Sequence, residues 1–194
     1  MKSKRLGSEI IRLALPATIE NIFQTLVGFF DTLLIAQLGL VAVTAVGLAN
    51  TILNVYLAVF LAIGVGGTAL IARSLGAGQK EKARQYAHQT QELSIAGGIV
   101  FGFISIFFGR WMLQAMGASG SALEDAQVFF YWVGGFSLLH ASMTSLGTIL
   151  RATGDTVTPM KVGIITNVTN VLLDYFLIFG FGSWDGLGIL GTAL

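Results

Sequence analysis

Long apolar runs separated by short polar connections recur along the whole chain. Each run is about 20 residues long, the length that an α-helix needs to cross the hydrocarbon core of a bilayer. The pattern therefore predicts an all-α fold, a polytopic bundle of five transmembrane helices and the start of a sixth. The predicted helices cover residues 10–37, 44–72, 86–113, 126–150 and 158–181, and the sixth covers 187–194 onward.

Composition agrees with this fold class and limits the partners. Of the 194 residues, 54% are hydrophobic and 11% are charged, whereas a soluble domain of this length carries roughly a quarter charged residues. So small a globule could not bury five such runs, and membrane lipid is the expected surrounding. The net charge of +1 leaves no basic face for a nucleic acid. The lack of cysteine excludes disulfides and cysteine-based metal sites.

Basic residues gather on one side of the predicted membrane. They lie at the N-terminus and in the connections after the second and fourth predicted helices, whereas the other side receives only Arg110. Because short loops rich in lysine and arginine stay in the cytoplasm, the sequence predicts a multi-pass protein of the plasma (inner) membrane with a cytoplasmic N-terminus. The residues that orient the bundle are Lys2, Lys4, Arg5, Arg12, Arg73, Lys80, Lys82, Arg84, Arg151 and Lys161.

The first predicted helix is apolar enough to span a bilayer, yet it carries several polar side chains. Glu20, Gln24 and Asp31 fall within ~40° of one another around the helix axis. An ionised carboxylate in hydrocarbon costs several kcal/mol, so it normally faces a bundle interior or a water-filled cavity. This helix is therefore predicted to carry an ion or proton site. Pro16 interrupts its hydrogen bonding, either as a simple kink near the start of the helix or as a hinge.

The fifth predicted helix, 158–181, carries a second polar stripe. Asn167, Asn170 and Asp174 are spaced i, i+3 and i+7, which places them on one face. This helix runs in the same direction as the first. Asp31 and Asp174 each lie about seven residues before the outer end of their helix, which is about 10 Å below the outer surface. The two aspartates are therefore predicted to share one depth.

The sixth predicted helix adds a hydroxyl group at this depth, because Thr192 lies about six residues below its outer end. Asp31, Asn170, Asp174 and Thr192 are therefore predicted to bind a cation or a proton. Hard oxygen atoms suit a hard cation such as Na⁺, whereas two carboxylates that share a dry site can instead hold a proton. The structural alternative is that each aspartate only forms hydrogen bonds with a neighbouring helix.

Three further polar residues are candidates for lining a cavity: Glu20, Gln24 and Asn167. Glu20 is also a second candidate for proton binding, although it lies nearer the inner surface. His140 falls in the middle of the fourth predicted helix. We predict that it is a buried core histidine rather than a pH sensor.

Four stretches of the chain, in this order and spacing, match one known family. They are RLALPATIENIFQTLVGFFDTLLIAQLG, GVGGTALIARSLGAGQKEKARQYA, LRATGDTVTPMK, and NVLLDYFLIFG followed by GLGILGTAL. Each stretch alone is a weak signal, but together they cover most of the chain. The chain resembles the N-terminal half of a multidrug and toxic compound extrusion (MATE) family transporter, in the branch that includes archaeal and DNA-damage-inducible members.

This resemblance implies an antiporter rather than an enzyme. Na⁺ or protons would enter while an amphipathic, often cationic drug leaves by alternating access, with no cofactor besides the coupling ion. The resemblance assigns the cation site to Asp31, Asn170, Asp174 and Thr192, and a bent helix to Pro16. Family members have two six-helix lobes. Residues 1–194 are therefore expected to be the N-terminal lobe and to need a C-terminal lobe, absent from this chain, as a partner.

Two other functions use similar features. A lipid-linked oligosaccharide flippase of the same superfamily needs a more cationic cavity to hold pyrophosphate, and this sequence places almost no Arg or Lys inside its helices. An intramembrane aspartyl protease needs a YD and a GxGD motif. Here Asp174 precedes Tyr175, and the GD dipeptide at Gly154 lies in a loop. A membrane assembly subunit would leave Asp31 and Asp174 unexplained.

Overall fold

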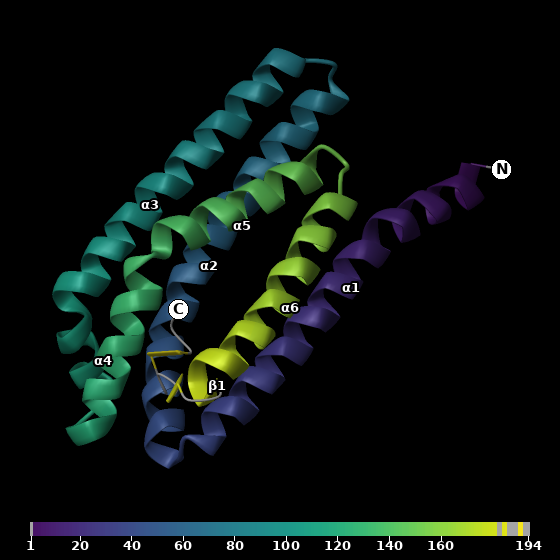
Figure 1. Ribbon diagram of the computed structural model, residues 1–194. Coiled ribbons are helices and arrows are strands. Elements are labelled where there is room, and N and C mark those ends of the chain that lie inside the picture. Colours follow the sequence, from purple (N-terminus) through teal and green to yellow (C-terminus); the bar gives the residue numbers. More distant parts are fainter. Residues whose placement is uncertain (1, 182–183, 186–189, 192–194) are drawn as a thin grey trace.

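The computed structural model describes residues 2–181, 184–185 and 190–191, which form a bundle of six helices and a short strand pair (Figure 1). The two strands pair antiparallel. Thr192 and most of the sixth predicted helix, 187–194, lie outside the described residues. The elements are α1 (Lys2–Gln37), α2 (Leu40–Gly76), α3 (Lys80–Ala115), α4 (Gly120–Gly135), α5 (Ser137–Ala152), α6 (Val157–Phe179), β1 (Gly180–Phe181) and β2 (Trp184–Asp185).

Several of these helices are long and apolar enough to cross a membrane. Within the described part of the chain, four single helices meet this criterion, and α4 and α5 together form a fifth span if the bent pair is counted as one. This confirms the predicted all-α transmembrane bundle. The four single spans are Ala14–Gln37, Leu40–Gly76, Lys80–Ala115 and Val157–Ile178.

The fourth span is bent, although the sequence predicted one continuous helix over 126–150. The axes of α4 and α5 differ by 48° at Phe136. Gly134 and Gly135 precede this break, and the Ser137 hydroxyl donates a hydrogen bond to the Gly134 carbonyl oxygen. Adjacent glycine and serine residues are a recognised cause of sharp helix kinks. The bend therefore falls at the glycine pair.

Small residues bring α3 against α4 and α5. A Cβ atom added to Gly98 would lie 2.6 Å from the Leu138 Cα atom, and one added to Gly102 would lie 2.8 Å from the Gly135 carbonyl oxygen. Such approaches are possible only for glycine. In a membrane no hydrophobic force drives helices together, so small residues at the contact let van der Waals packing hold them. Gly98 and Gly102 therefore allow α3 to pack closely against α4 and α5 at the centre of the bundle.

Helices α1 and α6 lie side by side and run in the same direction (Figure 1). Glu20 of α1 contacts Gly163 of α6, and further along Asp31 contacts Asp174. Eleven residues separate the two contact points on each helix, so the pair keeps one register over about 16 Å. The N-terminal part of α1 extends beyond the start of α6 and away from the bundle (Figure 1).

A capped turn joins α5 to α6 outside the membrane spans. Gly154 adopts a positive φ of 91°, and its N–H donates to the Arg151 carbonyl oxygen, which closes the end of α5. Asp155 Oδ1 then accepts hydrogen bonds from the backbone N–H groups of Val157 and Thr158, at 3.1 and 2.9 Å. The hydrogen bonds from Thr158 hold the pKa of Asp155 below its usual value. The end of α5 is therefore fixed relative to the start of α6.

Candidate functional site

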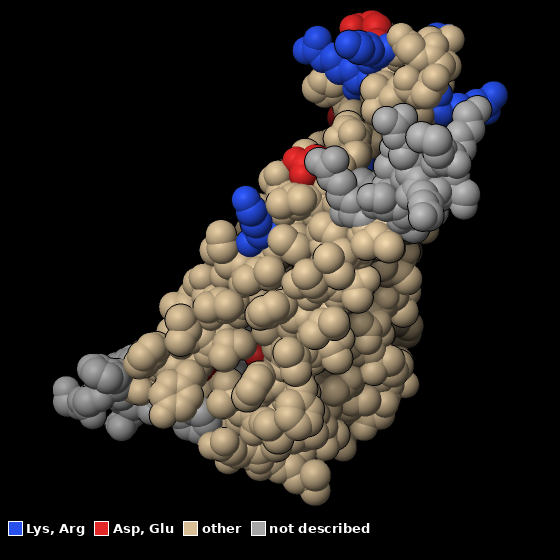
Figure 2. All heavy atoms as spheres, turned by 90° about the vertical axis from the view of Figure 1, so that its right-hand side faces the viewer, with Lys and Arg blue, Asp and Glu red and all other residues tan. Residues whose placement is uncertain are grey.

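The candidate site is a pair of aspartates on the two parallel helices. Asp31 projects from α1 and Asp174 from α6, and their carboxyl groups lie close enough to interact. Two neighbouring carboxyl groups can form a hydrogen bond only when one of them holds a proton, because two ionised carboxylates have only acceptors. The face that carries α1 is almost uncharged over its lower half, apart from acidic atoms recessed beneath the surface (Figure 2).

One oxygen atom of this pair has no partner. Asp31 Oδ1 is buried, and no described group donates a hydrogen bond to it. No salt bridge between described residues reaches Asp31 or Asp174 either. An unsatisfied carboxylate oxygen inside a membrane is costly, so this atom is suited to binding a proton or a cation. Carboxylate oxygens are the type of ligand that a hard cation prefers.

Asn170 and Thr192 are the other two predicted members of the cation site. Asn170 lies one helical turn before Asp174, on the same side of α6, and its side chain is exposed. Thr192 lies outside the described residues. No group of three or more histidine, cysteine or acidic residues that could hold a metal occurs in the described part of the chain. The structure thus brings two of the four residues into contact.

Glu20 has a cation partner of its own. It is 7% exposed, and one guanidinium nitrogen of Arg151, Nη2, donates to its Oε1 at 2.7 Å and to its Oε2 at 2.8 Å. Sequence reasoning assigned Arg151 to the basic loop that orients the bundle and so missed this ion pair. Of the other cavity-lining candidates, Asn167 is half-buried and Gln24 is exposed. The register of α1 and α6 places these two residues at the same level.

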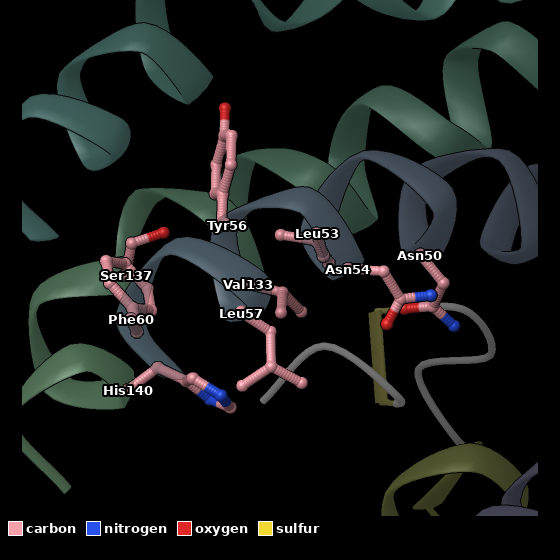
Figure 3. A pocket seen from close by; sticks show the side chains of 9 residues that line it. All are labelled: Asn50, Leu53, Asn54, Tyr56, Leu57, Phe60, Val133, Ser137 and His140. Carbon is pink, nitrogen blue, oxygen red and sulfur yellow. The ribbon is translucent and has the colours of Figure 1, made fainter. Parts of the chain in front are cut away.

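A cavity of about 180 Å³ opens beside α2 (Figure 3). The side chains of Asn50 and Asn54 lie next to each other at one end, and the imidazole of His140 lies on the same side as Leu57 (Figure 3). Tyr56 points the opposite way, toward α3, where its oxygen accepts a hydrogen bond from Ser105 at 3.2 Å. The lining residues, from α2, α4 and α5, are Asn50, Leu53, Asn54, Tyr56, Leu57, Phe60, Val133, Ser137 and His140.

This cavity corrects the prediction for His140. The side chain is exposed rather than buried in a core, because it lies on the open side of α5 where the cavity begins. The cavity itself was not predicted, since three helices contribute to it. A signal was present in Asn50 and Asn54, two amides four residues apart in an otherwise apolar run.

The chain is similar to known proteins over most of its length. The MatE family model matches residues 16–176. The chain is 33% identical to the probable multidrug resistance protein NorM of Thermotoga maritima over 97% of its length, and 27% identical to the FAD transporter of Shewanella oneidensis over 99%. Among solved structures, a MOP superfamily transporter from Pyrococcus furiosus superposes with a TM-score of 0.88 at 28% identity over 95% of the chain.

In each case the chain corresponds to only part of the relative. It spans 41% of the Thermotoga protein, 42% of the Shewanella protein and 40% of the Pyrococcus chain. Some relatives are named for multidrug resistance and one for FAD transport, so the substrates named for these relatives differ.

Proposed function

The chain belongs to the MatE family, and on this premise we propose that it is the N-terminal lobe of a cation-coupled antiporter for amphipathic, often cationic compounds. The observation that carries the proposal is the contact between Asp31 and Asp174, together with the unpartnered buried Oδ1 atom of Asp31. A second lobe, provided by another part of the protein or by another chain, completes the transporter. Alternating access requires two such units to move against each other.

Coupling follows from the charge of the aspartate pair. With a proton or Na⁺ bound, the pair loses one negative charge, which favours a state in which α1 and α6 pack closely. When the cation leaves, the two carboxylates repel each other. The coupling cation and a cationic drug then compete for the lobe, because each binds more tightly to a different conformation of it. Asn170 and Thr192 would add neutral oxygen ligands if Na⁺ is the ion.

The cavity beside α2 is the proposed contact surface for the drug. Its wall is mostly apolar, with Phe60 and Leu57, and the amides of Asn50 and Asn54 supply a few directed hydrogen bonds. None of its lining residues, all of which are described, is a lysine or an arginine. A site for pyrophosphate would need such cations. The lining therefore favours an uncharged or cationic amphipathic substrate over a lipid-linked oligosaccharide.

The orientation proposed from the sequence accords with the surface. Lysine and arginine side chains gather at the upper end of the molecule, where the loop between α2 and α3 lies (Figures 1 and 2). Among the described residues this end carries Arg73, Lys80, Lys82 and Arg84, all of which are exposed. We infer that it faces the cytoplasm of a cell bounded by the plasma (inner) membrane. The opposite end then faces outward, with the aspartate pair nearer to it.

Efflux from vesicles tests the antiport reaction. We expect proteoliposomes that contain the full gene product to move a cationic fluorescent dye faster when an opposing gradient of protons or of Na⁺ is imposed. Each gradient is applied separately, and an ionophore that collapses it is the control. Dye movement that is indifferent to both gradients would contradict cation coupling.

A further inference from the structure

Helix α1 carries two carboxylates whose surroundings differ. Asp31 meets another acid and keeps one unpartnered oxygen, whereas Glu20 is already neutralised by Arg151 of α5. Both residues lie on the side of α1 that faces α6. The coupling residues proposed above therefore occupy one end of this contact, and the Glu20–Arg151 ion pair occupies the other.

Arg151 is held in place by its own segment of chain. Its carbonyl oxygen accepts the Gly154 N–H that closes α5, and the next residue, Asp155, accepts two N–H groups from the first turn of α6. The turn therefore fixes the base of the Arg151 side chain relative to the start of α6. A group bound to the guanidinium is therefore tethered, through the Arg151 side chain, to a point near the start of α6.

Glu20 connects this fixed point to α1. Its side chain crosses Gly163 of α6, where an added Cβ atom would lie 3.4 Å from the Glu20 Cγ and Oε1 atoms. Beyond this glycine, both carboxylate oxygens reach Arg151 Nη2. The 3.4 Å separation at Gly163 is an ordinary van der Waals distance, so Glu20 packs directly on the backbone of α6 at this position. The Glu20 side chain therefore links α1, past α6, to α5.

We propose that the Glu20–Arg151 ion pair positions Asp31 beside Asp174 by fixing the register of α1 on α6. The two contact points lie eleven residues apart on both helices, so anchoring one end determines which residues meet at the other. A slip of one residue along the axis displaces the helix by about 1.5 Å and turns it by about 100°. Either change separates the two aspartates. Glu20 and Arg151 are positioning residues, and they bear on the proposed function only through the pair that they align.

The geometry of the ion pair predicts that the positive charge at position 151 matters more than the forked shape of the arginine side chain. A single nitrogen atom bridges both oxygens of Glu20, rather than the two nitrogens of a forked guanidinium contact. A lysine ammonium can make the same bridge. We therefore expect R151K to preserve the register, whereas R151M retains most of the aliphatic stem but has no cation and should release α1.

Cross-linking measures the register without any transport. The chain contains no cysteine, so D31C/D174C in the full gene product provides two thiols at the point of contact. A short bifunctional thiol reagent is applied to membranes that contain this pair alone, with R151K, with R151M, or with E20Q/R151M. The last variant removes both charges, so it leaves no buried unpaired carboxylate that could unfold the protein. Elution as a single folded peak on size exclusion is required of each protein.

We expect the parent pair and R151K to cross-link at the same rate, and R151M and E20Q/R151M to cross-link at least about fivefold more slowly, since thiol bridging requires close approach. Cross-linking of E20Q/R151M at the parent rate would overturn the proposal, because the register would then persist without the ion pair. This outcome is independent of whether the aspartates couple transport, which the vesicle experiment tests separately.

Discussion

Replacing Asp31 by asparagine in the full gene product is expected to abolish cation-driven dye efflux while leaving the amount of folded protein unchanged. Asparagine has nearly the same size as aspartate, but it cannot become negatively charged and so cannot exchange a proton or a cation. Asp31 contacts Asp174 and leaves one buried oxygen unpartnered. We expect efflux to fall by at least about tenfold, to the level of protein-free vesicles, and D174N to behave in the same way.

The matched control for this substitution is D125N. Asp125 lies in the first turns of α4, away from α1 and α6, and the change has the same chemistry. We expect D125N to retain the parent rate of efflux. Full efflux by D31N at equal protein content would show that Asp31 has no part in coupling.

Replacing Gly98 by alanine is expected to destabilise the bundle strongly. The new Cβ atom would lie 2.6 Å from the Leu138 Cα atom, which belongs to the backbone of α5 and cannot rotate away. Helices α3 and α5 would have to separate at the centre of the bundle. Overpacking of this kind costs typically about 1–3 kcal/mol, which should appear as a lower unfolding midpoint of the purified protein in detergent, followed by thermal size exclusion.

The preceding residue provides the control. A Cβ atom at Gly97 would lie 3.7 Å from the Phe60 ring, an ordinary van der Waals distance. The helix propensity gained is the same for both substitutions, so G97A should leave the midpoint unchanged or raise it slightly. If G98A and G97A melted together, the close contact between α3 and α5 would not limit stability.

The long spans could be predicted from the sequence because hydropathy alone requires them. A run of about 20 apolar residues has few stable arrangements other than a membrane-spanning helix. The break between α4 and α5 could not be predicted in this way. Gly134 and Gly135 are compatible with a straight, closely packed helix and with a bent one, and only the structure shows the bend.

The aspartate pair was also accessible from the sequence, since two helices that run the same way place residues at equal distances from their ends at equal depth. That reasoning gives the depth of Asp31 and Asp174 but not the direction in which they point. The structure supplies the contact between them. Asn170 and Thr192 remain predictions as ligands, the latter because it lies outside the described residues.

The partner of Glu20 was missed for a different reason. Counting Arg151 among the basic loop residues treats it as solvated, whereas its long side chain returns to the bundle and reaches a buried carboxylate. The cavity beside α2 was missed because Asn50 and His140 come from different helices. In both cases the sequence specifies the residues, but only the packing of α5 against its neighbours shows what they meet.

The two acids of α1 illustrate how surroundings separate a structural role from a chemical one. Glu20 has both oxygens bound by one nitrogen of an arginine, so its charge is already balanced within the protein. Among the described residues, Asp31 has another acid beside it and a buried oxygen to which no group donates. Of the two, Asp31 is therefore the one suited to binding and releasing a cation during transport.

Infrared difference spectroscopy of the full gene product in lipid tests most directly whether Asp31 and Asp174 share an exchangeable proton. Spectra are recorded between acidic and neutral pH, with and without Na⁺, and the carbonyl stretch of a protonated carboxyl group is followed. We predict a titrating band that shifts in D31N and in D174N, because in each variant the remaining carboxyl group loses its acidic neighbour, and that disappears in D31N/D174N. The same band, unchanged in D31N/D174N, would show that the exchangeable proton resides elsewhere.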